Sequence, residues 1–91
     1  MQHSLKNKEK IVLDAIAKVL YKLRVEQGKS QRILAFEYGI QKSLISRIES
    51  ASNSPLFITV WMLAEALGIK PSVFVAMLEE ELPDGFSLIE Q

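Results

Sequence analysis

The sequence of 91 residues contains no cysteine and a single histidine, His3. A disulfide framework and a thiolate zinc site are therefore excluded, and a histidine-based metal site is disfavoured, so no metal and no cofactor is expected. The longest apolar stretches, residues 55–64 and 73–78, are far shorter than the roughly 20 residues that span a bilayer. Residues 1–8 lack the apolar core and cleavage site of a secretory signal. We therefore expect a cytoplasmic protein with no membrane partner.

The chain also lacks an excess of charge of either sign, because 11 basic side chains balance 11 acidic ones. Domains that bind nucleic acid usually carry more Lys and Arg than this. The charges are unevenly spread, however. Residues 1–32 hold eight basic and three acidic side chains, whereas residues 58–91 hold one basic and six acidic ones. Ordinary solvated helix faces and a basic face backed by an acidic one explain this gradient equally well.

Apolar residues recur at helical spacing along the whole chain, and no strand pattern of useful length appears. The pattern predicts an all-α fold, and the length allows one compact domain. Helices are predicted over residues 6–27, 31–38, 41–50, 56–67 and 71–82. Gly28 ends the first helix, Ser30 is a suitable N-cap for the second, and Pro71 suits the first turn of the fifth. Pro83-Asp84-Gly85 then ends the fifth helix, which leaves residues 83–91 as a tail.

The second and third predicted helices are short and are separated by Gly39-Ile40. This is the spacing of a helix-turn-helix, in which the first helix crosses the DNA backbone and the next enters the major groove. Spacing alone is weak evidence, because many helical domains place two short helices around a glycine. A more specific pattern consists of Leu23-Arg24, Gly28, Ser30-Gln31, Leu34-Ala35, Gly39-Ile40, Ile45-Ser46-Arg47-Ile48-Glu49, Pro55, Leu63-Ala64 and Ala66-Leu67-Gly68-Ile69.

Together these residues resemble the Xre family, which includes the lambdoid phage repressors and Cro proteins. The resemblance covers Val19 to Phe74 and is most specific from Ser30 to Glu49. It implies a five-helix, repressor-like domain over residues 1–82, followed by the tail of residues 83–91. It also implies that Arg24 and Glu49 pair across the first and third helices.

The resemblance further implies two sets of DNA-contacting residues. The base-contacting positions are Gln41, Lys42, Ser43, Ser46 and Arg47. The phosphate-contacting positions are Ser30, Gln31, Ser52 and Asn53. Arg and Lys can donate to guanine, and Gln can pair with adenine, so this face suits a mixed sequence. The loop after the third helix, which usually carries a glycine and basic residues in this family, is uncharged here. Fewer phosphates are then neutralised, which predicts a shallower salt dependence of binding.

Several apolar residues receive structural interpretations. Leu34, Tyr38, Ile40, Ile45 and Ile48 are expected to pack between the second and third helices, and Trp61 is expected in the core. Leu44 either touches a thymine methyl group or packs internally. Four positions that are usually polar in relatives are apolar in this chain, namely Ile33, Phe36, Ile58 and Met62. Exposure toward a protein partner or a second subunit and burial under the first helix explain these four equally well.

The predicted function is sequence-specific binding of double-stranded DNA by a transcriptional regulator that acts as a homodimer on a two-fold operator. The fifth helix and the tail are the expected dimer surface, and a disordered tail is the alternative. The apolar residues in question are Val73, Phe74, Met77, Leu78, Phe86, Leu88 and Ile89. A phage repressor, a restriction-modification controller and an antitoxin are all compatible with this prediction.

The second class of function is a protein-interaction module that keeps the fold without reading DNA. The neutral net charge, the uncharged loop and the additional apolar positions support it. An enzyme is the least favoured class, because no nucleophile–base pair, carboxylate dyad, phosphate loop or metal cluster can be assembled from these residues. No catalytic residue is therefore predicted.

Overall fold

The computed structural model describes residues 2–90, with side chains from Asn7 onward, so the side chain of His3 lies outside the described part. Within this range the chain forms five helices and no strand, which confirms the all-α prediction. The helices are α1 (Gln2–Glu26), α2 (Gln31–Tyr38), α3 (Lys42–Glu49), α4 (Phe57–Ala66) and α5 (Pro71–Glu81). Helix α1 begins four residues earlier than predicted, because residues 2–5 contain neither Gly nor Pro to stop a helix. The bounds of the other helices agree with the prediction to within one residue.

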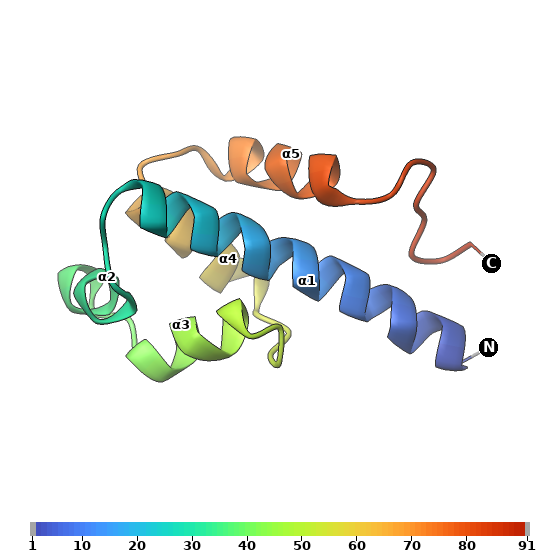
Figure 1. Ribbon diagram of the computed structural model, residues 1–91, viewed down its shortest axis with the longest axis horizontal. Coiled ribbons are helices and arrows are strands. Elements are labelled where there is room, and N and C mark those ends of the chain that lie inside the picture. The colour runs from blue at the N-terminus through green and yellow to red at the C-terminus, as the bar shows by residue number, and fades with distance from the viewer. Residues whose placement is uncertain (1, 91) are drawn as a thin grey trace.

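Helix α1 is the central element of the bundle. It contacts α3 on one side and α5 on the other, while α2 packs on α3 and α4 packs on α5 (Figure 1). As a result, α3 and α5 lie on opposite sides of α1, and the segment after α5 continues in the same direction beside the N-terminal half of α1. Within residues 2–90 no single helix is long and apolar enough to cross a bilayer; α4 and α5 pass that test only as a pair, bent by 105° at the break.

All five helices contribute to one hydrophobic core. The largest fully buried side chains are Leu20 of α1, Leu34 of α2, Ile45 and Ile48 of α3, Leu63 of α4, Leu67 just after α4, and Phe74 of α5. Four of the five residues predicted to pack between α2 and α3 are buried, namely Leu34, Ile40, Ile45 and Ile48. Leu44 is partly buried and packs against the same core, so its side chain serves packing.

Two residues predicted to be buried are instead on the surface. Tyr38 is 52% exposed, because the chain turns at Gly39 and Ile40 is buried in its place. The Lys29 ammonium lies over the face of the Tyr38 ring, with Nζ 5.6 Å from the ring centroid. Trp61 is 46% exposed, because α4 turns Leu63 and Ala64 toward the core. Its ring packs edge-to-face on Phe57 at 6.1 Å.

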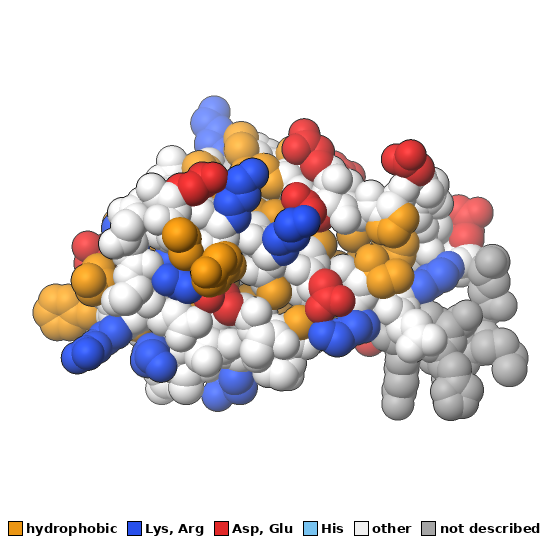
Figure 2. Space-filling model, viewed as in Figure 1, with side chains coloured by type: hydrophobic (Ala, Val, Ile, Leu, Met, Phe, Trp, Pro, Cys, Tyr) orange, Lys and Arg blue, Asp and Glu red, His pale blue; other side chains and the backbone are white. Residues whose placement is uncertain are grey.

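The four apolar positions that are usually polar in relatives are exposed, so burial under α1 is excluded for them. Phe36 is the most exposed of the set at 89%. The others are Ile33, Ile58 and Met62. Figure 2 shows hydrophobic side chains projecting at the end of the molecule where α2 lies.

The segment after α5 packs on its own chain. Lys8 Nζ donates to the carbonyl of Ser87 at 2.8 Å, and Leu88 lines a hollow with Val12 and Leu13 of α1. Lys18 also pairs with Glu81 at the end of α5, at 2.8 Å. Phe74 is fully buried in its own core. Part of the apolar set predicted to form a dimer surface is therefore used within the protomer.

Because Phe74 is fully buried, replacing it tests how much the hydrophobic core contributes to stability. Phe74→Ala should lower the free energy of unfolding by about 3–5 kcal/mol, because it removes a fully buried ring and leaves a cavity. Phe36→Ala makes the same chemical change on the surface and should alter stability by less than about 0.5 kcal/mol. Urea unfolding of both variants measures the difference, and equal losses would contradict the packing described here.

Candidate nucleic-acid interface

Local hydrogen bonds define the geometry of α2, the turn and α3. The Ser30 hydroxyl accepts from the backbone N–H of Ile33 at 3.0 Å, which caps the start of α2. At its other end Gly39 adopts a φ of 65°, and the N–H of Ile40 donates to the carbonyl of Ala35 at 3.0 Å. A left-handed residue is needed here, and glycine provides it without a steric cost. The sequence therefore sets a tight turn that brings α3 against α2.

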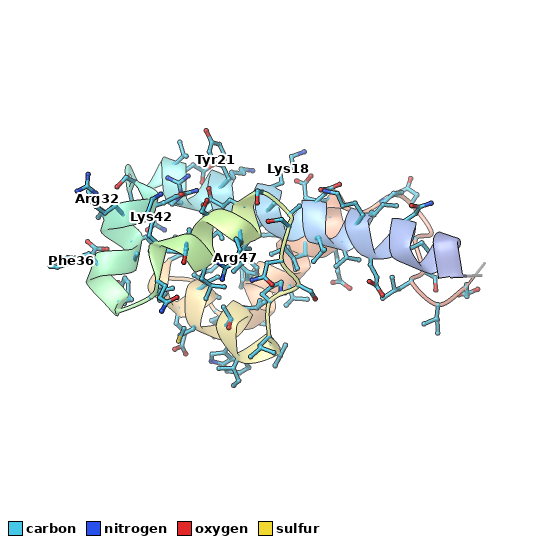
Figure 3. The ribbon with its side chains drawn as sticks, turned by 90° about the horizontal axis from the view of Figure 1, so that it is seen from below. Lys18, Tyr21, Arg32, Phe36, Lys42 and Arg47 are labelled. Carbon is cyan, nitrogen blue, oxygen red and sulfur yellow. The ribbon has the colours of Figure 1, made fainter. Side chains whose placement is uncertain are left out.

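Helix α3 has one buried and one exposed face. Ile45 and Ile48 are buried against α1 and α2. The other face carries the five positions predicted to contact bases: Gln41, Lys42, Ser43 and Arg47 are exposed, and Ser46 is half-buried. Figure 3, viewed from the side on which α3 lies, shows Lys42 and Arg47 along this helix. Among the described residues no acidic group forms an ion pair with either of them, so both charges are available to a ligand.

An ion pair holds α3 against α1. Arg24 Nε donates to Glu49 Oε2 at 2.7 Å, and Arg24 Nη2 donates to Glu49 Oε1 at 2.8 Å. Both side chains are nearly inaccessible, with 9% and 6% of their surface exposed. The remaining guanidinium nitrogen, Nη1, donates to the carbonyl of Lys29 at 2.7 Å. The charges are thus paired in bidentate geometry and further satisfied by hydrogen bonds, which a buried ion pair requires.

Gln31 joins the same network, which the sequence did not reveal. Its Nε2 donates to Glu49 Oε1 at 2.9 Å, so the side chain predicted to contact a phosphate is held in place by α3. An amide nitrogen carries two hydrogens, which leaves one to donate elsewhere. The sequence did not predict the hydrogen bond between Gln31 and Glu49, because the two residues are 18 positions apart.

Arg24 and Lys29 have raised pKa values. The hydrogen bond to Glu49 raises the pKa of Arg24 above its usual range, against the opposing effect of burial. The hydrogen bond to Glu37 likewise raises the pKa of Lys29. When the pKa of a basic group is higher in the folded state than in the unfolded state, the group stabilises the fold at every pH below the unfolded-state pKa. This contribution is lost only as the pH rises through the folded-state pKa. Both cations therefore remain charged throughout the neutral range.

The loop after α3 replaces the expected glycine with a strained alanine. Ala51 is buried and adopts a φ of 58°, which favours glycine. The Ser52 N–H donates to the carbonyl of Arg47 at 3.0 Å, and its hydroxyl bonds to the same carbonyl and to Ser50 Oγ. The Ser52 hydroxyl has one hydrogen, so this side chain can donate to a phosphate only by giving up a bond within the loop. Asn53 is half-buried and forms no side-chain hydrogen bond within the described residues.

The charges of the molecule are segregated around this interface. Figure 2 shows most of the acidic side chains on the upper part of the molecule, over α5 and the tail, where a basic side chain also projects, and basic side chains along the lower edge beneath α2 and α3 and across the middle of this face. Glu79, Glu80 and Glu81 belong to α5, on the far side of α1 from α3. Arg32, which the sequence interpretation did not single out, is exposed in the first turn of α2 (Figure 3). The lower edge beneath α2 and α3 is therefore predominantly basic on this face, while acidic groups predominate over α5 and the tail.

The HTH_3 helix-turn-helix family model matches residues 20–74. The chain belongs to this helix-turn-helix family. The matched region contains α2, α3 and α4 complete, together with the last turns of α1, including Arg24. The network around Glu49 therefore lies inside the family domain, while most of α1 and the tail lie outside it.

Known helix-turn-helix proteins resemble the chain in sequence and structure. The restriction-modification controller protein C.Esp1396I, crystallised as a tetramer on its natural operator, is 28% identical, with a TM-score of 0.71 over 77% of this chain and 92% of the controller. An HTH_3 family transcriptional regulator from Vibrio cholerae is 31% identical, with a TM-score of 0.69 over 75% of this chain and 38% of that protein.

Among curated proteins, the HTH-type transcriptional regulator SutR of Escherichia coli K12 is 28% identical over 76 residues. This match covers 84% of the chain and 43% of SutR, so the chain spans less than half the length of this relative.

Breaking the buried pair should be costly. Arg24→Ala should lower the free energy of unfolding by about 3–5 kcal/mol, because it leaves the Glu49 carboxylate buried without its cation. Lys10→Ala removes one partner of an exposed pair with Asp14 and should cost less than about 1 kcal/mol. Thermal and urea unfolding measure both. A parent-like stability of Arg24→Ala would mean that the pair does not hold the structure together.

Proposed function

We propose that this helix-turn-helix protein binds double-stranded DNA sequence-specifically and regulates transcription, as a homodimer on a two-fold operator. The observation that carries the proposal is the exposed face of α3, on which Lys42 and Arg47 lie without an acidic partner within the described residues. That face is held at a defined angle by the buried pair of Arg24 and Glu49. A rigid helix with exposed donors on one side is what recognition in the major groove requires.

Each side chain has a specific role in this proposal. Lys42 and Arg47 donate to guanine O6 and N7, while Gln41, Ser43 and Ser46 contact neighbouring base edges. Ser30, Gln31 and Asn53 contact phosphates, which sets the register of α3 on the duplex without reading sequence. The start of α2 also favours a phosphate, because its first N–H groups point outward and carry partial positive charge.

The relatives support the same function. C.Esp1396I is a controller protein crystallised on its operator, and SutR and the Vibrio cholerae protein are transcriptional regulators. A homodimer follows from the geometry of recognition, since one α3 covers only a few base pairs and two copies double the site that is read. We also propose that the protein is cytoplasmic, that its operator is two-fold symmetric and that it has no enzymatic activity.

The alternative function is a protein-interaction module, and the apolar face of α2 is the observation that favours it. Ile33 is 48% exposed and Phe36 is 89% exposed. Figure 3 shows Phe36 on α2, at one end of the molecule. A selection from a pool of random duplex DNA decides between the two functions. Enrichment of a two-fold motif is expected from the DNA-binding protein, and no enrichment above background would favour the interaction module.

Replacing a base-contacting residue should change both affinity and specificity. Lys42→Ala and Arg47→Ala should each cost about 1–3 kcal/mol of binding free energy on the selected site and relax the preference at one base pair. Lys18→Ala is the matched control, because it removes the same charge from the flank of α1 (Figure 3). Titrations on the selected duplex and on single-base variants measure the effect. Equal weakening on every sequence would identify these residues as phosphate contacts.

Gln31→Ala should show the opposite profile. We expect an affinity loss of similar size on all sequences, because a phosphate contact carries no direct base information. The variant also loses the hydrogen bond to Glu49, so unfolding is measured alongside binding. Arg24 still neutralises Glu49 in this variant, so its stability should fall much less than that of Arg24→Ala. A changed base preference would contradict the role assigned to Gln31.

A further inference from the structure

Arg32 is the third cation of the helix-turn-helix of residues 31–49, beside Lys42 and Arg47. It is exposed in the first turn of α2, one residue after Gln31, and forms no ion pair within the described part of the chain. Figure 3 shows Arg32 at the same end of the molecule as Lys42, the first residue of α3. A cation in this place is available to a ligand that approaches α2 and α3 together.

The acidic side chains of α2 and α3 are already engaged by other cations. These two helices contain only two acidic residues, Glu37 and Glu49. Glu37 pairs with Lys29 at 2.7 Å, and Glu49 pairs with Arg24. Because each carboxylate is paired with a side chain from outside the two helices, neither is left to neutralise Arg32. An anion that meets this side of the molecule therefore encounters an uncompensated positive charge.

The loop after α3 offers no such charge. Residues 50–54 are Ser, Ala, Ser, Asn and Ser, and the Ser52 hydroxyl is bonded within the loop. Affinity for the DNA backbone comes mainly from cations that neutralise phosphates. In the proposed function Lys42 and Arg47 face bases, so Arg32 is the one cation of residues 31–49 left for the backbone. Of the two segments that flank α3, α2 carries a free charge and the loop carries none.

The position of Arg32 on α2 separates it from Gln31. Leu34 is buried in the core, whereas Arg32 and Phe36, one turn apart, share the exposed face of α2. The Gln31 side chain is instead turned toward α3, where it binds Glu49. Arg32 and Gln31 therefore extend in different directions from the same turn, and they do not compete for one phosphate.

We propose that Arg32 binds a second phosphate, next to the one assigned to Gln31, and supplies the backbone-neutralising charge that the loop after α3 lacks. The inference rests on the proposed function and adds to it a residue that sets the salt dependence of binding. The contact is an ion pair with phosphate oxygens, which an arginine can hold through two parallel hydrogen bonds. It carries no direct sequence information, because every base pair presents the same phosphates.

The salt dependence of DNA binding tests this role. Fluorescence anisotropy with the selected duplex gives the dissociation constant of each variant between about 50 and 200 mM KCl. Arg32→Ala should lower the magnitude of the slope of log K against log salt concentration by about 0.9 for each bound chain, because one phosphate is no longer neutralised. Arg32→Gln keeps hydrogen-bond donors without the charge and should show the same loss. Arg32→Lys keeps the charge and should retain the slope of the parent.

Lys10→Ala is the matched control. Lys10 is exposed in the N-terminal half of α1, which lies at the other end of the molecule from α2 (Figure 1), so its loss should leave the slope unchanged. A duplex selection with Arg32→Ala should return the base preference of the parent, unlike selections with Lys42→Ala and Arg47→Ala. Circular dichroism melting of the Arg32 variants should match the parent, because exposed side chains outside ion pairs contribute little to stability.

A parent that binds with the same slope as Arg32→Ala overturns this inference alone. A changed base preference of Arg32→Ala also overturns it, because Arg32 is then a base contact. Loss of slope in Arg32→Lys does the same, because the effect is then not one of charge. A parent chain that selects no motif and binds no duplex overturns the proposed function, and this inference with it.

Discussion

The bidentate pair between Arg24 and Glu49 is the interaction on which the arrangement of α1, α2 and α3 depends. It joins α1 to the last residue of α3 by two hydrogen bonds of 2.7 and 2.8 Å, in surroundings that exclude most water. A salt bridge in such a place contributes little net stability, since desolvation offsets most of the attraction. The pair instead fixes the orientation of α3 relative to α1, because planar groups that meet through two parallel hydrogen bonds permit few relative orientations.

The same carboxylate also links α3 to α2. Glu49 Oε1 accepts from both Arg24 and Gln31, and Arg24 in turn reaches the carbonyl of Lys29 just before α2. One buried carboxylate therefore fixes the positions of α2 and α3 relative to each other. In the proposed function, backbone contacts and base contacts are held in one register by this network rather than independently.

Because α1 lies between α3 and α5, the surfaces formed by these two helices face opposite sides of the molecule. Basic side chains predominate beneath α2 and α3, and acidic ones predominate over α5 and the tail, so a chain of zero net charge still presents a basic side. The net charge of a protein says little about binding when the charges are segregated in this way.

The sequence by itself determined the helices, their order and the family. Helical periodicity, Gly39 and Pro71 act within a few residues, and local backbone preferences need no tertiary context. It also indicated which face of α3 is polar. Only the tertiary structure decided that Tyr38 and Trp61 are exposed, that Gln31 binds Glu49, and that the tail packs on α1. Periodicity marks an apolar residue as able to be buried, but its burial depends on which distant helix covers it. Residues 18 or 79 positions apart meet only when the whole chain has packed.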